Sequence, residues 1–147
     1  MQLTRAADYA VRVMVHLAGL TSGARATKSQ LAASGDVPEA FVGKILQALS
    51  RGGLITSHRG SVGGFTLARP ADSVTLLDVV ELMEGPLQLN ACLGPNPSCG
   101  RLAWCCVHDV WARAQEALTG VLRGVTIASL AQATANRELS GGRREWN

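Results

Sequence analysis

Apolar residues that recur at helical spacing dominate the first half of the chain, and this periodicity constrains the fold more than any other feature. Intervals of four and three residues mark one face of a helix from about 4 to 20, which ends at Thr21-Ser22-Gly23. The residues of this apolar stripe are Leu3, Ala7, Ala10, Met14 and Leu17. Such a stripe has to be covered by other elements, so the segments that follow decide the architecture.

Two shorter helices are predicted directly after the first. Thr27 precedes Gln30 by three residues, the spacing of a capping box, so a helix is expected from there to about residue 34. Pro38 suits the first turn of a third helix, which should stop at Gly52. Three helices with short turns indicate a helix-turn-helix. The side chains of the third helix expected to point inward are Phe41, Val42, Ile45, Leu46 and Leu49.

A short β-hairpin is predicted immediately after the third helix. Residues 54–57 and 65–67 have the composition of strands, and the glycine-rich loop 59–64 between them must turn back on itself. A hairpin that directly follows a helix-turn-helix is a wing. The sequence therefore predicts a mainly α fold with a small β-hairpin wing, a winged helix-turn-helix.

The second half of the chain is predicted to contain a long helix over 102–123. Its apolar residues repeat at intervals of four and three, like a heptad seam. In a chain of 147 residues such a seam more often pairs two subunits than fills one core, so we expect a C-terminal dimerisation helix and a homodimer. The seam consists of Val107, Trp111, Ala114, Leu118, Val121 and Val125.

Four regions follow from these patterns. Residues 1–85, including a helix from Thr75 to Met83, form the winged helix-turn-helix DNA-binding region. Residues 86–101 form a cysteine-rich loop that its glycines and prolines keep irregular. Residues 102–135 hold the dimerisation helix and a short terminal helix over 126–135. Residues 136–147 have no periodicity and are expected to be a mobile tail.

The distribution of charge is more informative than the net charge of +3. Residues 1–70 carry eight basic and three acidic groups, and the remainder carries six basic and eight acidic groups. A basic half beside a mildly acidic half fits a module for a polyanion such as double-stranded DNA, joined to a module that does not bind it.

Several function classes are excluded by what the sequence lacks. It contains no phosphate-binding loop, nucleophile elbow or paired-carboxylate motif, so we expect no enzyme. It has no apolar run of about 20 residues and no export signal, so we expect no membrane association and a cytoplasmic location. In that reducing compartment, clustered cysteines favour metal or redox ligands over disulfides.

Three spaced thiols carry the most distinctive chemistry of the chain. Cys92, Cys99 and Cys105 are separated by six and five residues across the bent loop, and His108 follows Cys105 by three. Soft thiolates in such a loop can converge on one metal centre. The absence of a C-x-x-C pair favours an iron–sulfur cluster, but three cysteines with His108 could also bind zinc. Cys106 would point about 100° away from Cys105 on a helix, so it is not expected to share the centre.

These features together resemble the IscR and NsrR regulators of the Rrf2 family over about residues 1–135. The resemblance implies a transcriptional regulator, most simply a repressor, built as a homodimer of winged-helix heads with a long crossing helix. It also implies a two-iron or four-iron cluster that controls DNA affinity in response to nitric oxide, redox state or iron–sulfur status. The matching residues are Leu3-Thr4, Asp8-Tyr9-Ala10, Arg59-Gly60, Gly63-Gly64, the three cysteines and Trp111.

The resemblance leaves two residues as candidates for a fourth cluster ligand. His108 matches the spacing of the ligand histidine in the cluster-synthesis regulators. Asp8 matches an aspartate that the nitric-oxide sensors take from the first helix of the partner subunit. Two alternatives to an iron–sulfur regulator stay open: a zinc-stabilised regulator, and a regulator whose thiols sense oxidants directly.

The DNA contacts are expected on the third helix, at the start of the second helix and on the wing. Lys44 and Gln47 can reach base edges, and Arg59 suits the narrow minor groove. Gly43 stands where the cluster-synthesis regulators have an acidic residue that helps them discriminate between DNA sites. The full set is Lys28, Ser29, Glu39, Ala40, Gly43, Lys44, Gln47, Arg59 and Gly60.

Overall fold

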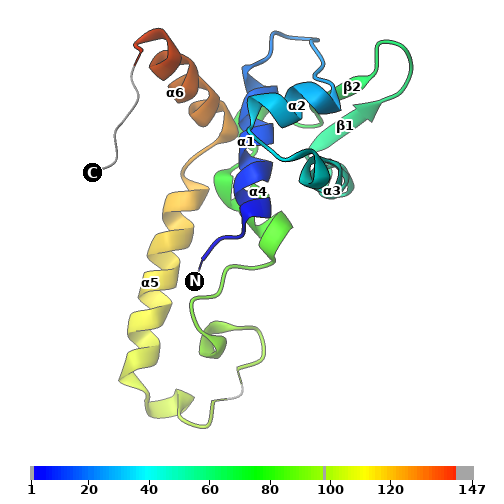
Figure 1. Ribbon diagram of the computed structural model, residues 1–147. Coiled ribbons are helices and arrows are strands. Elements are labelled where there is room, and N and C mark those ends of the chain that lie inside the picture. Colours follow the sequence, from blue (N-terminus) through cyan, green and yellow to red (C-terminus); the bar gives the residue numbers. More distant parts are fainter. Residues whose placement is uncertain (1, 98, 142–147) are drawn as a thin grey trace.

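A computed structural model describes residues 2–97 and 99–141, and within them a helical head carries a two-stranded hairpin, while one long helix extends away from it (Figure 1). The α-helices are α1 (Arg5–Gly19), α2 (Lys28–Ser34), α3 (Glu39–Arg51), α4 (Leu76–Glu84), α5 (Cys106–Arg123) and α6 (Ile127–Leu139). The strands are β1 (Ile55–His58) and β2 (Gly64–Leu67), and three 3₁₀ turns are η1 (Ala71–Ser73), η2 (Ala91–Leu93) and η3 (Leu102–Trp104).

Side-chain caps fix where the helices of the head begin. The Thr4 hydroxyl accepts a hydrogen bond from the Ala7 N–H at the start of α1. Thr27 with Gln30 forms a complete capping box on α2, as the sequence predicted. The caps satisfy N–H groups that the first turn of a helix leaves without partners. The three predicted helices of the first half are therefore confirmed.

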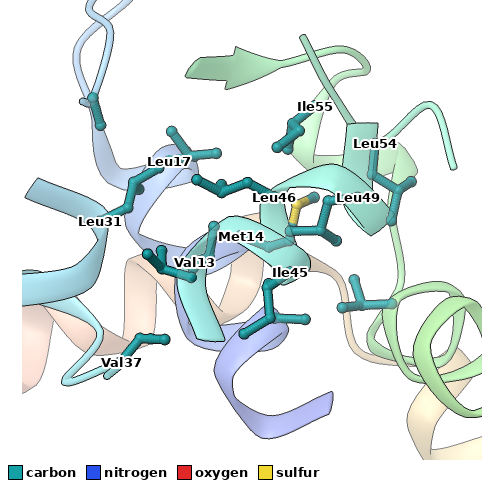
Figure 2. Close-up of a cluster of buried hydrophobic side chains, with 14 of the residues drawn as sticks. Val13, Met14, Leu17, Leu31, Val37, Ile45, Leu46, Leu49, Leu54 and Ile55 are labelled. Carbon is teal, nitrogen blue, oxygen red and sulfur yellow. The ribbon is translucent and has the colours of Figure 1, made fainter. Parts of the chain in front are cut away.

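The core lies around α1, against which α3, α4 and α6 pack (Figure 1). Figure 2 shows Val13 and Met14 of α1 meeting Ile45 and Leu49 of α3, with Leu31 of α2 alongside. Every fully buried side chain in this cluster is apolar, and the described residues include no buried polar or charged side chain. The head is thus held mainly by apolar burial.

The predicted wing is present, shifted by one residue at the ends of its strands. β1 and β2 pair antiparallel, with Ile55 opposite Leu67 at one end and His58 opposite Gly64 at the other. This register puts Ile55 into the core and leaves Thr56 and Ser57 exposed. The mainly α winged helix-turn-helix predicted from the sequence is therefore confirmed.

Two residues predicted to point inward are exposed. Leu3 precedes the cap of α1, so it lies outside the helix whose stripe it was expected to join, and it is 41% exposed. Phe41 is 48% exposed and packs on Tyr9, with the ring centroids 6.1 Å apart. Helical spacing misplaced Phe41 because it lies at the edge of the apolar face, where only tertiary packing decides burial.

The boundaries in the second half differ from the sequence prediction. The long helix begins at Cys106, four residues later than predicted, because Cys105 adopts an extended backbone (φ −87°, ψ 100°) after the separate turn η3. α6 continues to Leu139, so the predicted end at residue 135 was placed too early. Of the expected tail, residues 142–147 lie outside the described residues. Among the described helices, none combines the length and apolarity that crossing a membrane requires.

Candidate DNA-binding face and metal-ligand loop

One surface of the head is formed by the start of α2, the outer side of α3 and the wing. Four inward residues of α3 are buried: Val42, Ile45, Leu46 and Leu49. Their burial fixes the rotation of α3, so Glu39, Ala40, Lys44 and Gln47 are exposed. Lys28 and Ser29 in the first turn of α2, and Arg59 and Gly60 on the wing, are exposed as well. These predicted DNA contacts therefore belong to accessible segments of one helix-turn-helix and its wing.

Gly43 has a neighbour that the sequence did not reveal. A β-carbon at this position would lie 3.5 Å from the Lys28 Nζ, so the ammonium group lies over the middle of α3. Both residues line a hollow of about 410 Å³ together with Gln47, Ser57 and Phe65. Because Gly43 has no side chain, the Lys28 ammonium group has room above α3, the helix expected to enter the major groove.

The wing is attached to the head by the segment between α1 and α2. The Phe65 N–H donates to the Ala26 carbonyl at 2.8 Å, and the Ala26 N–H donates to the Phe65 carbonyl at 3.2 Å. Gly64 is needed here: its φ is +149°, and a β-carbon would lie 2.8 Å from the Ala26 oxygen. This isolated bridge between Ala26 and Phe65 ties the base of the hairpin to the head.

The cysteines lie at the far end of the molecule from the wing, around the lower end of α5 (Figure 1). Cys92 belongs to η2, Cys99 lies in the irregular segment that follows, and Cys105 occupies the N-cap position of α5. All four thiols are free, with Cys92 and Cys105 partly buried and Cys99 and Cys106 exposed. Over residues 2–97 and 99–141, no group of three or more His, Cys, Asp or Glu side chains is arranged to hold a metal ion.

His108, in the first turn of α5, carries an unsatisfied polar atom. Its ring Nδ1 is buried without a hydrogen-bond partner, which is uncommon for a polar atom removed from water. Its main-chain N–H donates to the Cys105 carbonyl at 3.1 Å, so the histidine is held one turn beyond that thiol. Three thiols and an unpartnered imidazole nitrogen are chemically suitable donors for an iron–sulfur cluster or zinc.

Asp8, the other candidate ligand, belongs to α1 and forms an ion pair within that helix. Its carboxylate lies 2.7 Å from the Arg12 guanidinium, and both side chains are about half exposed. Arg12 also donates to the Gly35 carbonyl in the turn between α2 and α3 at 3.2 Å, and its guanidinium lies over the Tyr9 ring. Asp8 is thus accessible from outside this chain and adjacent to the helix-turn-helix.

Three hydrogen bonds that sequence reasoning missed join the cysteine loop to α5 and the end of α5 to the head. The Gln115 side-chain oxygen of α5 accepts from the Leu89 N–H at 3.0 Å and holds the start of the loop. At the other end of α5, the elbow between α5 and α6 (residues 124–127) is hydrogen bonded to the segment that leads into α4. The Leu76 N–H donates to the Val125 carbonyl at 2.8 Å, and the Ile127 N–H donates to the Val74 carbonyl at 2.9 Å. No local signal marks these bonds because their partners are far apart in sequence.

The winged helix-turn-helix with an exposed, basic recognition helix defines a DNA-binding protein of the winged-helix class. Comparison with known proteins identifies the group within that class. A family model described as Rrf2, iron-dependent transcriptional regulator, matches residues 3–133. The chain therefore belongs to the Rrf2 family of DNA-binding transcriptional regulators, a family that implies regulation rather than catalysis.

Individual relatives agree with this assignment. An HTH-type transcriptional regulator of Mycobacterium tuberculosis is 36% identical over 133 residues, which cover 89% of this chain and 81% of that protein. CymR, the global cysteine regulator of B. subtilis, matches with a TM-score of 0.75 at 22% identity, over 90% of this chain and 98% of CymR. IscR of T. potens matches with a TM-score of 0.73 at 20% identity, over 99% and 94% of the two chains. The two structural likenesses concern the fold alone.

Proposed function

We propose that this protein is a homodimeric repressor whose affinity for operator DNA is controlled by an iron–sulfur cluster on Cys92, Cys99 and Cys105. The fourth ligand is His108 or Asp8 of the partner subunit. The observation that carries the proposal is the buried, unpartnered Nδ1 of His108, a residue one turn along α5 from Cys105. The family description, an iron-dependent regulator, supports it. Because its target is chromosomal DNA, we place the protein in the cytoplasm.

A bound cluster would supply a centre whose stability depends on nitric oxide, oxidants and the supply of iron and sulfide. Hydrogen bonds within this chain connect the cysteine-rich loop to the DNA-binding head. Gln115 joins the loop to α5, and the pairing of Val74 with Ile127 joins the end of α5 to the head. A change in the order of the loop can thereby alter the spacing of two heads, which must match the spacing of two half-sites.

The test is iron and acid-labile sulfide analysis on anaerobically purified full-length protein, together with its visible absorbance. We expect bound iron and sulfide in the wild type and their loss from Cys92→Ser, Cys99→Ser and Cys105→Ser. Cys106→Ser is the matched control, since it removes an adjacent thiol that is not expected to be a ligand, and it should keep the cluster. Wild-type protein free of iron that still binds its operator at full strength would contradict the proposal.

The two candidates for the fourth ligand separate in the same assay. If His108 ligates, His108→Ala destabilises the cluster and Asp8→Ala leaves it intact. If Asp8 of the partner subunit ligates, Asp8→Ala destabilises the cluster and His108→Ala leaves it intact. Dilution of the dimer should then also promote cluster loss, because that ligand is supplied across the dimer interface.

A regulator that senses oxidants through free thiols, without a cluster, is the second candidate. One observation favours it: the described residues gather no metal-binding group of three. If the free thiols sense oxidants, the protein contains no iron, and its DNA affinity changes on treatment with peroxide and recovers with dithiothreitol. Zinc analysis on the same samples tests the third alternative, a zinc-stabilised regulator.

The DNA-binding face offers direct and indirect contacts. We propose that Lys44 and Gln47 contact base edges, that Lys28 and Ser29 contact the backbone, and that Arg59 enters the minor groove. Glu39, Ala40 and Gly43 complete the face on α3, and Gly60 completes it on the wing. Arg59→Ala should weaken binding of all operator variants in an anisotropy titration, and unchanged affinity would refute the role of the wing.

The homodimer is proposed from the face of α5 that the head does not cover. Val107, Trp111 and Val121 are 51%, 41% and 66% exposed, and α5 contains no buried residue in the single chain. An amphipathic helix with such an apolar face needs a partner. A second copy is the occupant we propose, because half-sites of an operator are bound by paired heads.

A further inference from the structure

The wing of this protein ends in a tight turn that is hydrogen bonded to one distant side chain. The Gly63 N–H donates to the Gly60 carbonyl at 3.0 Å and closes the turn Gly60–Gly63 directly after Arg59. Three glycines lie in or next to this turn, and Gly60 has a positive φ of 106°. A turn of this composition has more conformational freedom than other loops, so ordering it costs more entropy.

The side chain that restrains the turn comes from the segment between α1 and α2. The Arg25 Nη1 donates to the Val62 carbonyl at 2.9 Å across 37 residues of sequence. Arg25 directly precedes Ala26, whose main chain pairs with Phe65 at the base of the wing. The hairpin is thus held at two points, at its base by the main chain of Ala26 and at its tip by Arg25.

We propose that Arg25 is a positioning residue for DNA binding, which fixes the wing tip through the Val62 carbonyl so that Arg59 is presented to the minor groove. The inference rests on the proposed contact of Arg59 with DNA. Arg25 itself touches no nucleotide in this proposal. Its effect is to order the turn before DNA arrives, so less entropy is lost on binding.

The geometry suits this role. A guanidinium is always charged, and its bonds to a neutral acceptor are stronger than those between neutral groups. Both Arg25 and the wing tip are exposed, so the bond contributes little to folding and its removal leaves the core intact. Its main effect therefore falls on the order of the loop.

Arg69 provides a matched control. It is also an exposed arginine that donates to a main-chain carbonyl, that of Ser73 at 3.1 Å. Its bond lies beyond the base of the hairpin and does not reach the tip. Arg25→Ala and Arg69→Ala thus remove the same charge and the same kind of bond, one at the wing tip and one away from it.

The first measurements are the DNA affinity and wing mobility of the full-length protein. The probe is a duplex selected from a randomised DNA pool by the wild type. A hydrogen bond of this kind corresponds to about fivefold in affinity, so Arg25→Ala should bind about fivefold more weakly, with an unchanged melting temperature. Hydrogen–deuterium exchange of the free protein should increase in a peptide covering 59–64. Arg69→Ala should change neither quantity by a comparable amount.

A double-mutant cycle with Arg59→Ala separates positioning from direct contact. If Arg25 acts through Arg59, its removal has little further effect on affinity in the Arg59→Ala background. If Arg25 instead contacts a phosphate, the two effects add, and Arg25→Ala lowers the slope of log K against log salt by about 0.9 in that background. Additive effects with such a slope change would overturn the proposal.

The outcomes also distinguish this inference from the proposed function. If Arg59→Ala alone leaves affinity unchanged, the wing does not contact DNA and the basis of the inference fails. If Arg59→Ala weakens binding but Arg25→Ala matches the wild type in affinity and exchange, the positioning role of Arg25 alone is wrong.

Discussion

The elbow between α5 and α6 is predicted to be part of the folding core of the head, and Ile127→Ala tests this. Ile127 is completely buried and packs in the same cluster as Met14 and Leu49. Its N–H also donates to the Val74 carbonyl. The substitution removes most of a fully packed side chain from the centre of the molecule but leaves the main-chain bond possible.

The size of the effect follows from this burial. Truncation of a buried isoleucine to alanine costs about 2–5 kcal/mol, because a cavity is added to the lost transfer free energy. In a chain of this size each kcal/mol lowers the melting temperature by about 2–4 °C. At a middle value of about 3 kcal/mol, Ile127→Ala should therefore melt about 6–12 °C below the wild type. Ile127→Val should cost only about 0.5–1.5 kcal/mol.

Thermal unfolding followed by circular dichroism measures these differences. Protein concentration must be the same throughout, since the proposed dimerisation would make the melting temperature depend on it. Leu139→Ala is the control on the same helix, because Leu139 is 87% exposed and its removal should change stability by less than about 0.5 kcal/mol. Equal melting temperatures for Ile127→Ala and Leu139→Ala would refute the packing of α6 into the head.

Three further predictions follow from the caps, the wing and α5. Gly64→Ala should destabilise the protein by about 1–3 kcal/mol in urea unfolding, because the new β-carbon meets the Ala26 oxygen at 2.8 Å; Gly100→Ala, which meets nothing within 4 Å, should be neutral. Thr75→Ala should cost about 1 kcal/mol in the same assay, because it removes the capping box of α4, and an unchanged midpoint would contradict that role. Val121→Glu should convert the proposed dimer to monomers in light scattering, with helix content retained, because it places a charge on the uncovered face of α5; a dimer of undiminished stability would show that this face is not the interface.

The helices of the head could be predicted from sequence because their signals are local. The cap at Thr27, the stop at Gly52 and the apolar spacing each act within a few residues. The hairpin was predictable for the same reason, since its glycine-rich loop lies between two short strands. Burial at the edge of an apolar face could not be predicted in this way, as the exposure of Phe41 shows.

The candidate site was predictable only as a set of residue types. The thiols and His108 are recognisable from their spacing, but the buried Nδ1 of His108 and the bond between Gln115 and Leu89 depend on how the loop packs against α5. The position of Lys28 above Gly43 likewise required the angle between α2 and α3. None of these contacts has a local sequence signature.

Sequence alone determined the order of the helices, the presence of the wing and the residue types of the cysteine loop. Each of these follows from backbone preferences and side-chain types that act over one or two turns. Only the tertiary structure decided where the wing is held and how α5 joins the head. Arg25 meets Val62, and Val74 meets Ile127, across tens of residues. Such pairings form only when the packed core brings distant segments together, so the physical reason for them lies in the core rather than in either segment.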